Sequence, residues 1–128
     1  MSDKLTDPSA RRVVLMSIRP KYSRRIFRNE KRFELRRTPV RIEPSDLVLV
    51  YESSPVKALV GAFVVGSIRR GDKATMWEEL GDEFGVSGEE YRAYFAGACE
   101  AHAIEVGEAI EIEPISLDSL RGRHCGFP

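Results

Sequence analysis

The sequence predicts one α+β domain: a small mixed β-barrel with helices at its side. A chain of 128 residues is long enough for a single modest hydrophobic core. Short strand-like segments follow one another with few helical segments between them, which is typical of a barrel rather than of a doubly wound sheet. The longest of these segments, residues 58–68, contains Gly61 and Gly66, and glycines inside a strand often mark the bulges that a barrel requires.

The first half of the chain is expected to form strands around one helix. Residues 13–16 are a short apolar run that indicates a buried strand. A helix is predicted from Pro20 to about Asn29, because proline fits the first turn of a helix. Residues 32–37 alternate between apolar and charged side chains, and the runs 47–51 and 58–68 are apolar, so three strands should follow the helix.

The second half is expected to add two helices and a hairpin. Residues 72–84 carry an apolar stripe at helical spacing, and Ser87-Gly88-Glu89-Glu90 matches a capping box that starts the next helix. Residues 101–106 and 109–113 are predicted to be two strands joined by a tight turn at Gly107 and Glu108. Ser116 is expected to cap a last short turn through Leu120.

Composition places the chain among ordinary globular proteins, with 42% hydrophobic and 31% charged residues. The domain is expected to span residues 12–121, between a flexible leader (1–11) and a tail (122–128). No run approaches the ~18 apolar residues of a membrane span, and the polar first ten residues lack a signal-peptide core, so a cytoplasmic protein without a membrane partner is expected. The oligomeric state stays open.

The sequence contains few residue patterns typical of cofactor or metal sites. No glycine-rich phosphate loop is present, so no cofactor is expected. Cys99, His102, His124 and Cys125 contain the atoms of a zinc site, but adjacent ligands such as His124 and Cys125 seldom point at one metal, and no metal is expected.

Charge is distributed unevenly along the chain although its net value is zero. Residues 1–46 carry 13 Lys and Arg against 6 Asp and Glu, and the remainder carries 7 against 14. This division predicts one basic and one acidic surface, unless the two halves neutralise each other in the fold. The basic half is the candidate surface for a polyanionic partner.

Four cations share one face of the predicted first helix: Lys21, Arg24, Arg25 and Arg28. No carboxylate within that helix relieves their repulsion, so we expect either the acidic half of the chain or a phosphate backbone to do so. Arg19, Arg32 and Arg37 extend this basic helix face. Tyr22, Phe27 and Phe33 could stack on bases, but helical and strand periodicity favours the core for all three.

The segment from Ser17 to Arg36 carries a family resemblance. Ser17-Ile18-Arg19-Pro20-Lys21-Tyr22, followed by Lys31-x-x-Glu34-x-Arg36, resembles the opening motif of the ASCH domain family. The resemblance implies a PUA-like β-barrel with a cleft lined by Lys31, Glu34 and Arg36. It also implies RNA binding, and some members of the family are enzymes that act on RNA or on modified nucleosides.

Two positions depart from the family pattern. The usual glycine before the lysine is Asn29, a residue that tolerates the left-handed conformation and can still end a helix. The resemblance implies a Lys-x-x-Thr arrangement in members that hydrolyse N4-acetylcytidine, with the threonine as nucleophile, whereas this chain has Glu34 at the threonine position. A carboxylate is a poor replacement for a hydroxyl nucleophile in amide cleavage, so this chemistry is not expected here.

The function predicted from the sequence is therefore RNA binding, with DNA as a possible ligand and no catalysis of its own. The predicted contact residues are Arg19, Lys21, Arg24, Arg25, Arg28, Lys31, Arg32, Glu34 and Arg36. One alternative is a hydrolase acting on RNA or on a modified nucleoside, with Lys31 and Glu34 as acid–base partners. A second alternative is a protein-interaction module whose basic face meets an acidic partner or the acidic half of another copy.

Overall fold

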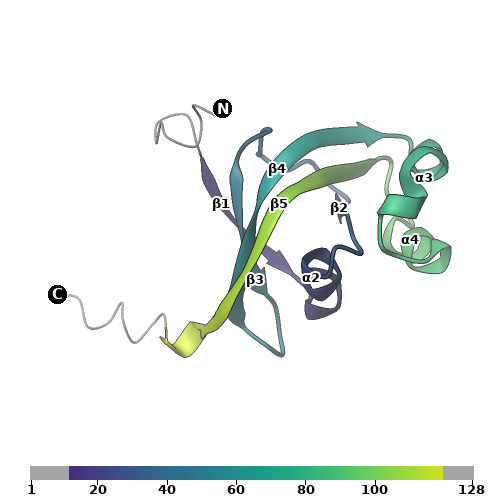
Figure 1. Cartoon of the computed structure of the whole chain (residues 1–128). Helices are drawn as coiled ribbons and strands as arrows, with labels where there is room; N and C mark the ends of the chain where they lie inside the picture. The colour runs from purple at the N-terminus through teal and green to yellow at the C-terminus, as the bar shows by residue number, and fades with distance from the viewer. Residues whose placement is uncertain (1–11, 120–128) are drawn as a thin grey trace.

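The computed structural model describes residues 12–119; the predicted leader, the tail, the end of the predicted domain and the His124–Cys125 pair lie outside this range. Within it, the strands form one five-stranded sheet in the order β1-β3-β4-β5-β2. β1 (Val13–Ile18) runs parallel to β3 (Leu47–Glu52), while β4 (Ala58–Gly71), β5 (Ala101–Ser116) and β2 (Phe33–Arg36) complete the sheet with antiparallel pairs. The sheet curls into a half-barrel, as Figure 1 shows, and the prediction of a mixed α+β barrel is confirmed.

Helices cover one side and one end of this sheet. α2 (Pro20–Phe27) follows β1, and a helical lobe made of α3 (Lys73–Leu80), the short 3₁₀ helix η2 (Gly81–Glu83) and α4 (Gly88–Tyr94) connects β4 to β5 (Figure 1). The single helix predicted over residues 72–84 is thus divided after Leu80. In the part of the chain that the structure describes, no helix is long and apolar enough to cross a bilayer.

Local signals in the sequence determine most helix ends. Pro20 occupies the first turn of α2, and Asn29 has a φ of 64°, so the predicted left-handed end of this helix is confirmed. The capping box of α4 is present, because Ser87 Oγ accepts from Glu90 N–H and the Glu90 carboxylate accepts from Ser87 N–H. Ser116 Oγ accepts from Ser119 N–H at 3.0 Å, as expected of a cap, although Leu120 lies outside the described residues.

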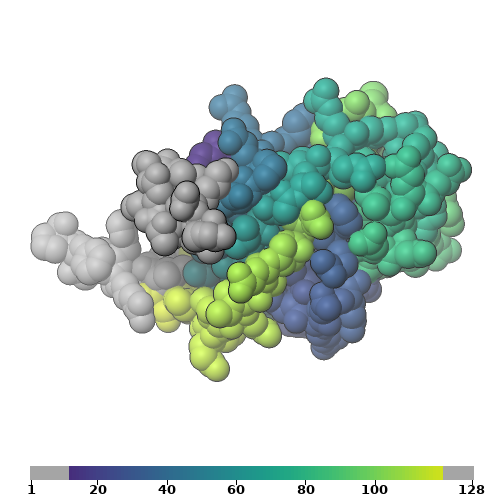
Figure 2. Space-filling view, turned by 45° about the horizontal axis from the view of Figure 1, so that its top comes forward, coloured from purple at the N-terminus to yellow at the C-terminus, as the bar shows by residue number. Residues whose placement is uncertain are grey.

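The predicted hairpin at Gly107 and Glu108 is wrong, because β5 continues through both residues as one long strand. A Cβ on Gly107 would lie 2.7 Å from the Val64 carbonyl oxygen of β4. The glycine therefore serves a close approach of two backbones, in a region where the β4–β5 register is irregular, and does not make a turn. Residues 107–114 are exposed, and in Figure 2 this part of β5 forms a yellow-green ridge on the surface.

The two glycines inside β4 accompany irregular pairing, as predicted. The register of β4 against β5 shifts between Leu59 and Gly61 and again between Val65 and Ile68, the segment that contains Gly66. Gly61 also lets α2 pack closely on the sheet, since a Cβ there would lie 2.5 Å from the Phe27 ring.

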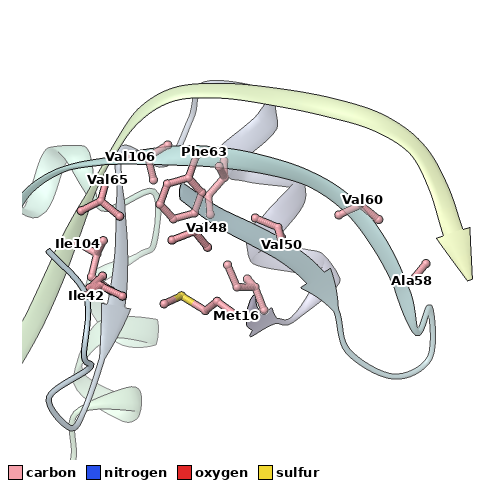
Figure 3. Close-up of a cluster of buried hydrophobic side chains, with 12 residues drawn as sticks. Met16, Ile42, Val48, Val50, Ala58, Val60, Phe63, Val65, Ile104 and Val106 are labelled. Atoms are coloured by element: carbon pink, nitrogen blue, oxygen red, sulfur yellow. The ribbon is translucent and has the colours of Figure 1, made fainter. Parts of the chain in front are cut away.

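The buried hydrophobic side chains form two clusters, one inside the half-barrel and one under the helical lobe. The first fills the concave side of the half-barrel, where Val48, Val50, Phe63 and Ile104 are almost completely buried under the arch of β4 and β5 (Figure 3). The second lies between β2 and the helical lobe and is rich in aromatic rings; its buried aromatic members are Phe33, Phe84, Tyr91 and Phe95. β2 pairs with β5 of the half-barrel and contributes Phe33 and Leu35 to the second cluster, so it lies between the sheet and the helical lobe.

The edge strands β1 and β2 do not pair with each other within residues 12–119, so the half-barrel is not closed by a backbone ladder there. Instead, the Arg36 guanidinium of β2 donates from Nη2 to the Ser17 carbonyl oxygen of β1 at 2.9 Å. The gap between these two edges is the place where the ASCH-like motif residues gather.

Candidate functional site

A pocket of about 280 Å³ lies at the gap between β1 and β2. Three groups of side chains line it: the end of β1 with the residue after it (Ser17, Ile18, Arg19), the β2 segment (Glu34, Leu35, Arg36), and α4 (Glu90, Tyr91, Tyr94). Tyr22, Lys31, Ser53 and Val86 complete the lining. The pocket therefore draws on the half-barrel, on α2 and on the helical lobe.

Lys31 is buried at the base of this arrangement, with only 2% of its surface exposed. It precedes β2, and its Nζ donates to the Phe84 carbonyl oxygen at 2.9 Å and lies 5.3 Å from the centre of the Tyr22 ring. Burial disfavours the charged amine and lowers the pKa of Lys31 from 10.5 to about 8, although the nearby Glu34 carboxylate opposes this shift. The amine is therefore able to exchange a proton near neutral pH.

Glu34 and Arg36 share one face of β2, as the alternation in the sequence predicts. Arg36 Nη2 lies 3.1 Å from Glu34 Oε2, and the Glu34 side chain is 8% exposed. Burial raises the pKa of Glu34, while the positive charges of Lys31 and Arg36 act in the opposite direction. Glu34 and Arg36 therefore both line the pocket, with Glu34 the more deeply buried of the two.

One donor in the pocket lining stands out. Arg36 Nε is buried and has no hydrogen-bond acceptor among the described residues. An unsatisfied buried N–H costs about 1–3 kcal/mol. Arg36 thus combines a structural contact to β1, an ion pair with Glu34 and an unused donor.

Residues 83–85 of the helical lobe contact Lys31 and its neighbours and so fix the position of the lysine. Three successive carbonyl oxygens accept hydrogen bonds: Glu83 from the Arg32 amide, Phe84 from Lys31 Nζ, and Gly85 from Arg25 Nη1. Gly85 has a φ of 65°, and a Cβ there would lie 2.6 Å from both Glu30 O and Lys31 Cβ. Only glycine allows this segment to approach the lysine so closely.

The rim of the pocket carries Tyr22 with three cations around its ring. Lys21 Nζ, Arg25 Cζ and Lys31 Nζ lie 5.4, 5.5 and 5.3 Å from the ring centre. Glu90 of α4 is paired with Lys21 at 2.8 Å and with Arg25 at 3.2 Å. The hydrogen bond from Lys21, followed by that from the Ser87 amide, lowers the pKa of Glu90 to about 2, so this carboxylate is ionised at neutral pH.

The predicted contact residues fall into three groups in the structure. Arg19, Lys31, Glu34 and Arg36 line the pocket, whereas Lys21 and Arg25 meet Glu90 at its rim. Arg24, Arg28 and Arg32 are exposed and do not line the pocket. The acidic half of the chain therefore neutralises part of the basic helix face, which is one of the two expected outcomes, but it leaves Arg24 and Arg28 in solvent.

Several pocket residues escape prediction from the sequence. Helical periodicity places Tyr22 in the core, and it does pack on the half-barrel core, yet its ring also lines the pocket. The sequence marks Glu90 only as part of a capping box, and nothing in it distinguishes Tyr94, which donates from its hydroxyl to the Leu35 carbonyl oxygen at 3.2 Å. Phe27 and Phe33 pack in the core as predicted.

Gly85→Ala is expected to lower the free energy of unfolding by about 1–3 kcal/mol, because the added Cβ meets Lys31 and the backbone must keep a positive φ. Gly71→Ala is the matched control, since a Cβ there meets nothing within 4 Å and should change stability by no more than about 0.5 kcal/mol. Urea denaturation of both variants measures the difference. Equal stabilities would contradict the close packing of residues 83–85 on Lys31.

Lys31 is also expected to give the stability of the protein a distinctive pH dependence. Because the pKa of Lys31 is about 8 in the folded chain and 10.5 is its ordinary value, the unfolded chain holds a proton between these values that the folded chain has lost. The free energy of unfolding of the wild type should therefore rise between about pH 8 and 10.5 relative to that of Lys31→Met. Parallel stability curves for the two proteins, measured by denaturant titration, would refute the lowered pKa.

Comparison with known proteins finds relatives over most of the chain. The family model of the ASCH domain matches residues 16–116. An ASCH domain-containing ribonuclease from Zymomonas mobilis is 31% identical over 123 residues, which cover 96% of this chain and 83% of that protein. The crystal structure of ASCH from Zymomonas mobilis aligns with a TM-score of 0.80 and 31% identity, covering 89% of this chain and 80% of that one.

A more distant structure shows the same fold. The solution structure of a Pyrococcus furiosus protein has a TM-score of 0.50 and 18% identity, and it covers 82% of this chain and 97% of its own. At this identity the likeness concerns the fold alone. The sequence resemblance between Ser17 and Arg36 thus extends over most of the chain, and this protein belongs to the ASCH domain family.

Proposed function

We propose that this ASCH domain binds single-stranded or looped RNA, with one nucleotide unit in the pocket and the adjoining phosphates along the basic helix face. The observation that carries the proposal is the position of Lys31 and Arg36 in one pocket, where the aromatic rings of Tyr22 and Tyr94 also contribute to the lining. Cationic donors suit phosphate oxygens or base carbonyls, and aromatic rings suit an unstacked base.

The size of the pocket favours a single nucleotide unit over a duplex. Its volume of about 280 Å³ is close to the lower limit of about 300–1,000 Å³ for small-molecule sites. A base enters such a pocket only after it leaves its stack, which single-stranded regions allow at small cost. The relative named as a ribonuclease supports RNA as the ligand class.

The exposed part of the basic helix face is suited to the strand outside the pocket. Arg24 of α2 and Arg28 at its C-cap are one turn apart and exposed, whereas Lys21 on the same face is already paired with Glu90. Contacts between exposed arginines and phosphates supply affinity without sequence selectivity and make binding salt-dependent.

Replacing Arg24 and Arg28 together by Ala should weaken the binding of a short single-stranded RNA and reduce the salt dependence of the binding constant. With about 0.7 counterions released per phosphate contact, the slope of log K against log salt should fall by about 1.4. Fluorescence anisotropy between about 50 and 200 mM salt measures this slope.

The matched control replaces Arg41 and Arg70, two exposed arginines outside α2 and the pocket, and removes the same net charge. Equal losses in both double variants would mean that only overall charge matters, and the role of the helix face would be wrong. An absence of RNA binding by the wild-type protein would contradict the proposed function itself.

A second candidate function, cleavage of the bound RNA, is favoured by one specific observation. Lys31 and Glu34 are buried in the same pocket, and burial moves the pKa of each toward neutrality. In such a reaction the Glu34 carboxylate would accept the proton of a ribose 2′-hydroxyl as its oxygen bonds to phosphorus. The bond to the 5′-oxygen would break, Lys31 would protonate that oxygen, and Arg36 would stabilise the charge on the phosphate oxygens.

Glu34→Gln separates binding from cleavage, because it keeps the shape of the side chain and removes its ability to accept a proton. The cleavage rate of a 5′-labelled RNA should fall at least about 100-fold, while the affinity should change little. The same strand with deoxyribose throughout should remain intact, since it lacks the attacking hydroxyl. Wild-type protein that binds RNA and never cleaves it would leave binding as the function and reject this second candidate.

A further inference from the structure

The rim of the pocket holds two cations and one carboxylate that bring distant segments together. Glu90 Oε2 lies 2.8 Å from Lys21 Nζ, and Glu90 Oε1 lies 3.2 Å from Arg25 Nη1. Lys21 and Arg25 are one turn apart on α2 and belong to the basic helix face, whereas Glu90 comes from α4. Each carboxylate oxygen thus contacts one cation, and two oxygens of a phosphate group could make the same two contacts.

An anion from solvent can reach the contact between Glu90 and the two cations. Lys21, Glu90 and Arg25 have side-chain exposures of 54, 24 and 27%, so water reaches all three. Because all three side chains remain partly exposed, a phosphate from solvent can compete with the carboxylate for the two cations. Glu90 also lines the pocket in which we place the nucleotide, so a strand that enters the pocket passes this contact.

We infer that Lys21 and Arg25 form a phosphate-binding subsite at the mouth of the pocket, and that Glu90 occupies this subsite as an internal substitute until RNA displaces it. The inference rests on the proposed function and adds a control element to it: the carboxylate lowers the affinity for weakly held polyanions. An RNA strand must then place a phosphate at the rim as well as a nucleotide in the pocket.

The two cations also have contacts that do not involve the carboxylate. Arg25 Nη1 also donates to the Gly85 carbonyl oxygen at 2.8 Å, and Lys21 and Arg25 both lie over the Tyr22 ring. Glu90 itself is held by the Ser87 amide at 2.8 Å through the capping box of α4. Displacement of the carboxylate therefore also releases the Ser87 amide, whereas Arg25 keeps its hydrogen bond to the Gly85 carbonyl oxygen.

The inference is tested with Glu90→Gln, because glutamine at this position still completes a capping box while the negative charge is lost. The matched control is Glu89→Gln, which makes the same charge change at an exposed neighbour in the same helix turn. The probe is a short single-stranded RNA of mixed sequence, and its affinity is measured at about 50 and 200 mM salt. Thermal unfolding of each variant verifies that the fold is retained.

Glu90→Gln is expected to bind the RNA about threefold to tenfold more tightly than Glu89→Gln does, as the loss of two competing surface ion pairs implies. Its slope of log K against log salt should also be steeper, by about 0.7 for each phosphate that the freed cations newly bind. Adding Lys21→Ala to Glu90→Gln should remove most of this increase in affinity, since the freed cation is then absent.

The outcomes separate the two proposals. If the wild type binds RNA and Glu90→Gln matches Glu89→Gln, or binds more weakly, the internal substitute is refuted and the RNA-binding pocket remains. If Lys21→Ala leaves the higher affinity of Glu90→Gln intact, the subsite has been assigned to the wrong residues. If the wild type binds no RNA at either salt concentration, the proposed function fails, and this inference fails with it.

Discussion

The hydrogen bond from the Lys31 amine to the Phe84 carbonyl oxygen connects the two parts of this fold. Lys31 leads into β2 at the edge of the half-barrel, while Phe84 is fully buried in the aromatic cluster of the helical lobe. The approach of Gly85 to Lys31 is possible only without a side chain at that position. Because the amine is buried and hydrogen-bonded to the helical lobe, the pocket has a cationic centre with a fixed position.

The electrostatic character of the pocket follows from this burial. A charged amine away from water is stabilised by anions that come close to it, and inside the protein Glu34 supplies part of that stabilisation. Arg36 closes the gap between β1 and β2 through the Ser17 carbonyl oxygen and adds a second positive charge to the same lining. The cations at this open barrel edge and on the basic helix face are the groups to which the proposed function assigns the contacts with an RNA strand.

Much of this arrangement could be predicted from the sequence, and the limits of that prediction have physical causes. The spacing of Lys31, Glu34 and Arg36 depends on local geometry, namely a left-handed residue at Asn29 followed by a strand, and the pattern indicates it correctly. The turn predicted at Gly107 is wrong because this glycine serves a close contact with Val64 of β4, a distant segment that no local pattern identifies. The pairing of Glu90 with α2 depends likewise on how α4 packs, so the sequence pattern reveals only its role in the capping box.

The central claim, that RNA places an anionic group in the pocket beside Lys31, is tested most directly by lysine-detected NMR. The pKa of the Lys31 amine is measured in the free protein and in the presence of saturating single-stranded RNA, with Lys31→Arg used to assign its signal. The free protein should give a value of about 8, and RNA should raise it, because a nearby phosphate favours the charged amine. A pKa of Lys31 that stays unchanged when RNA is bound would show that the strand binds elsewhere and would contradict the account.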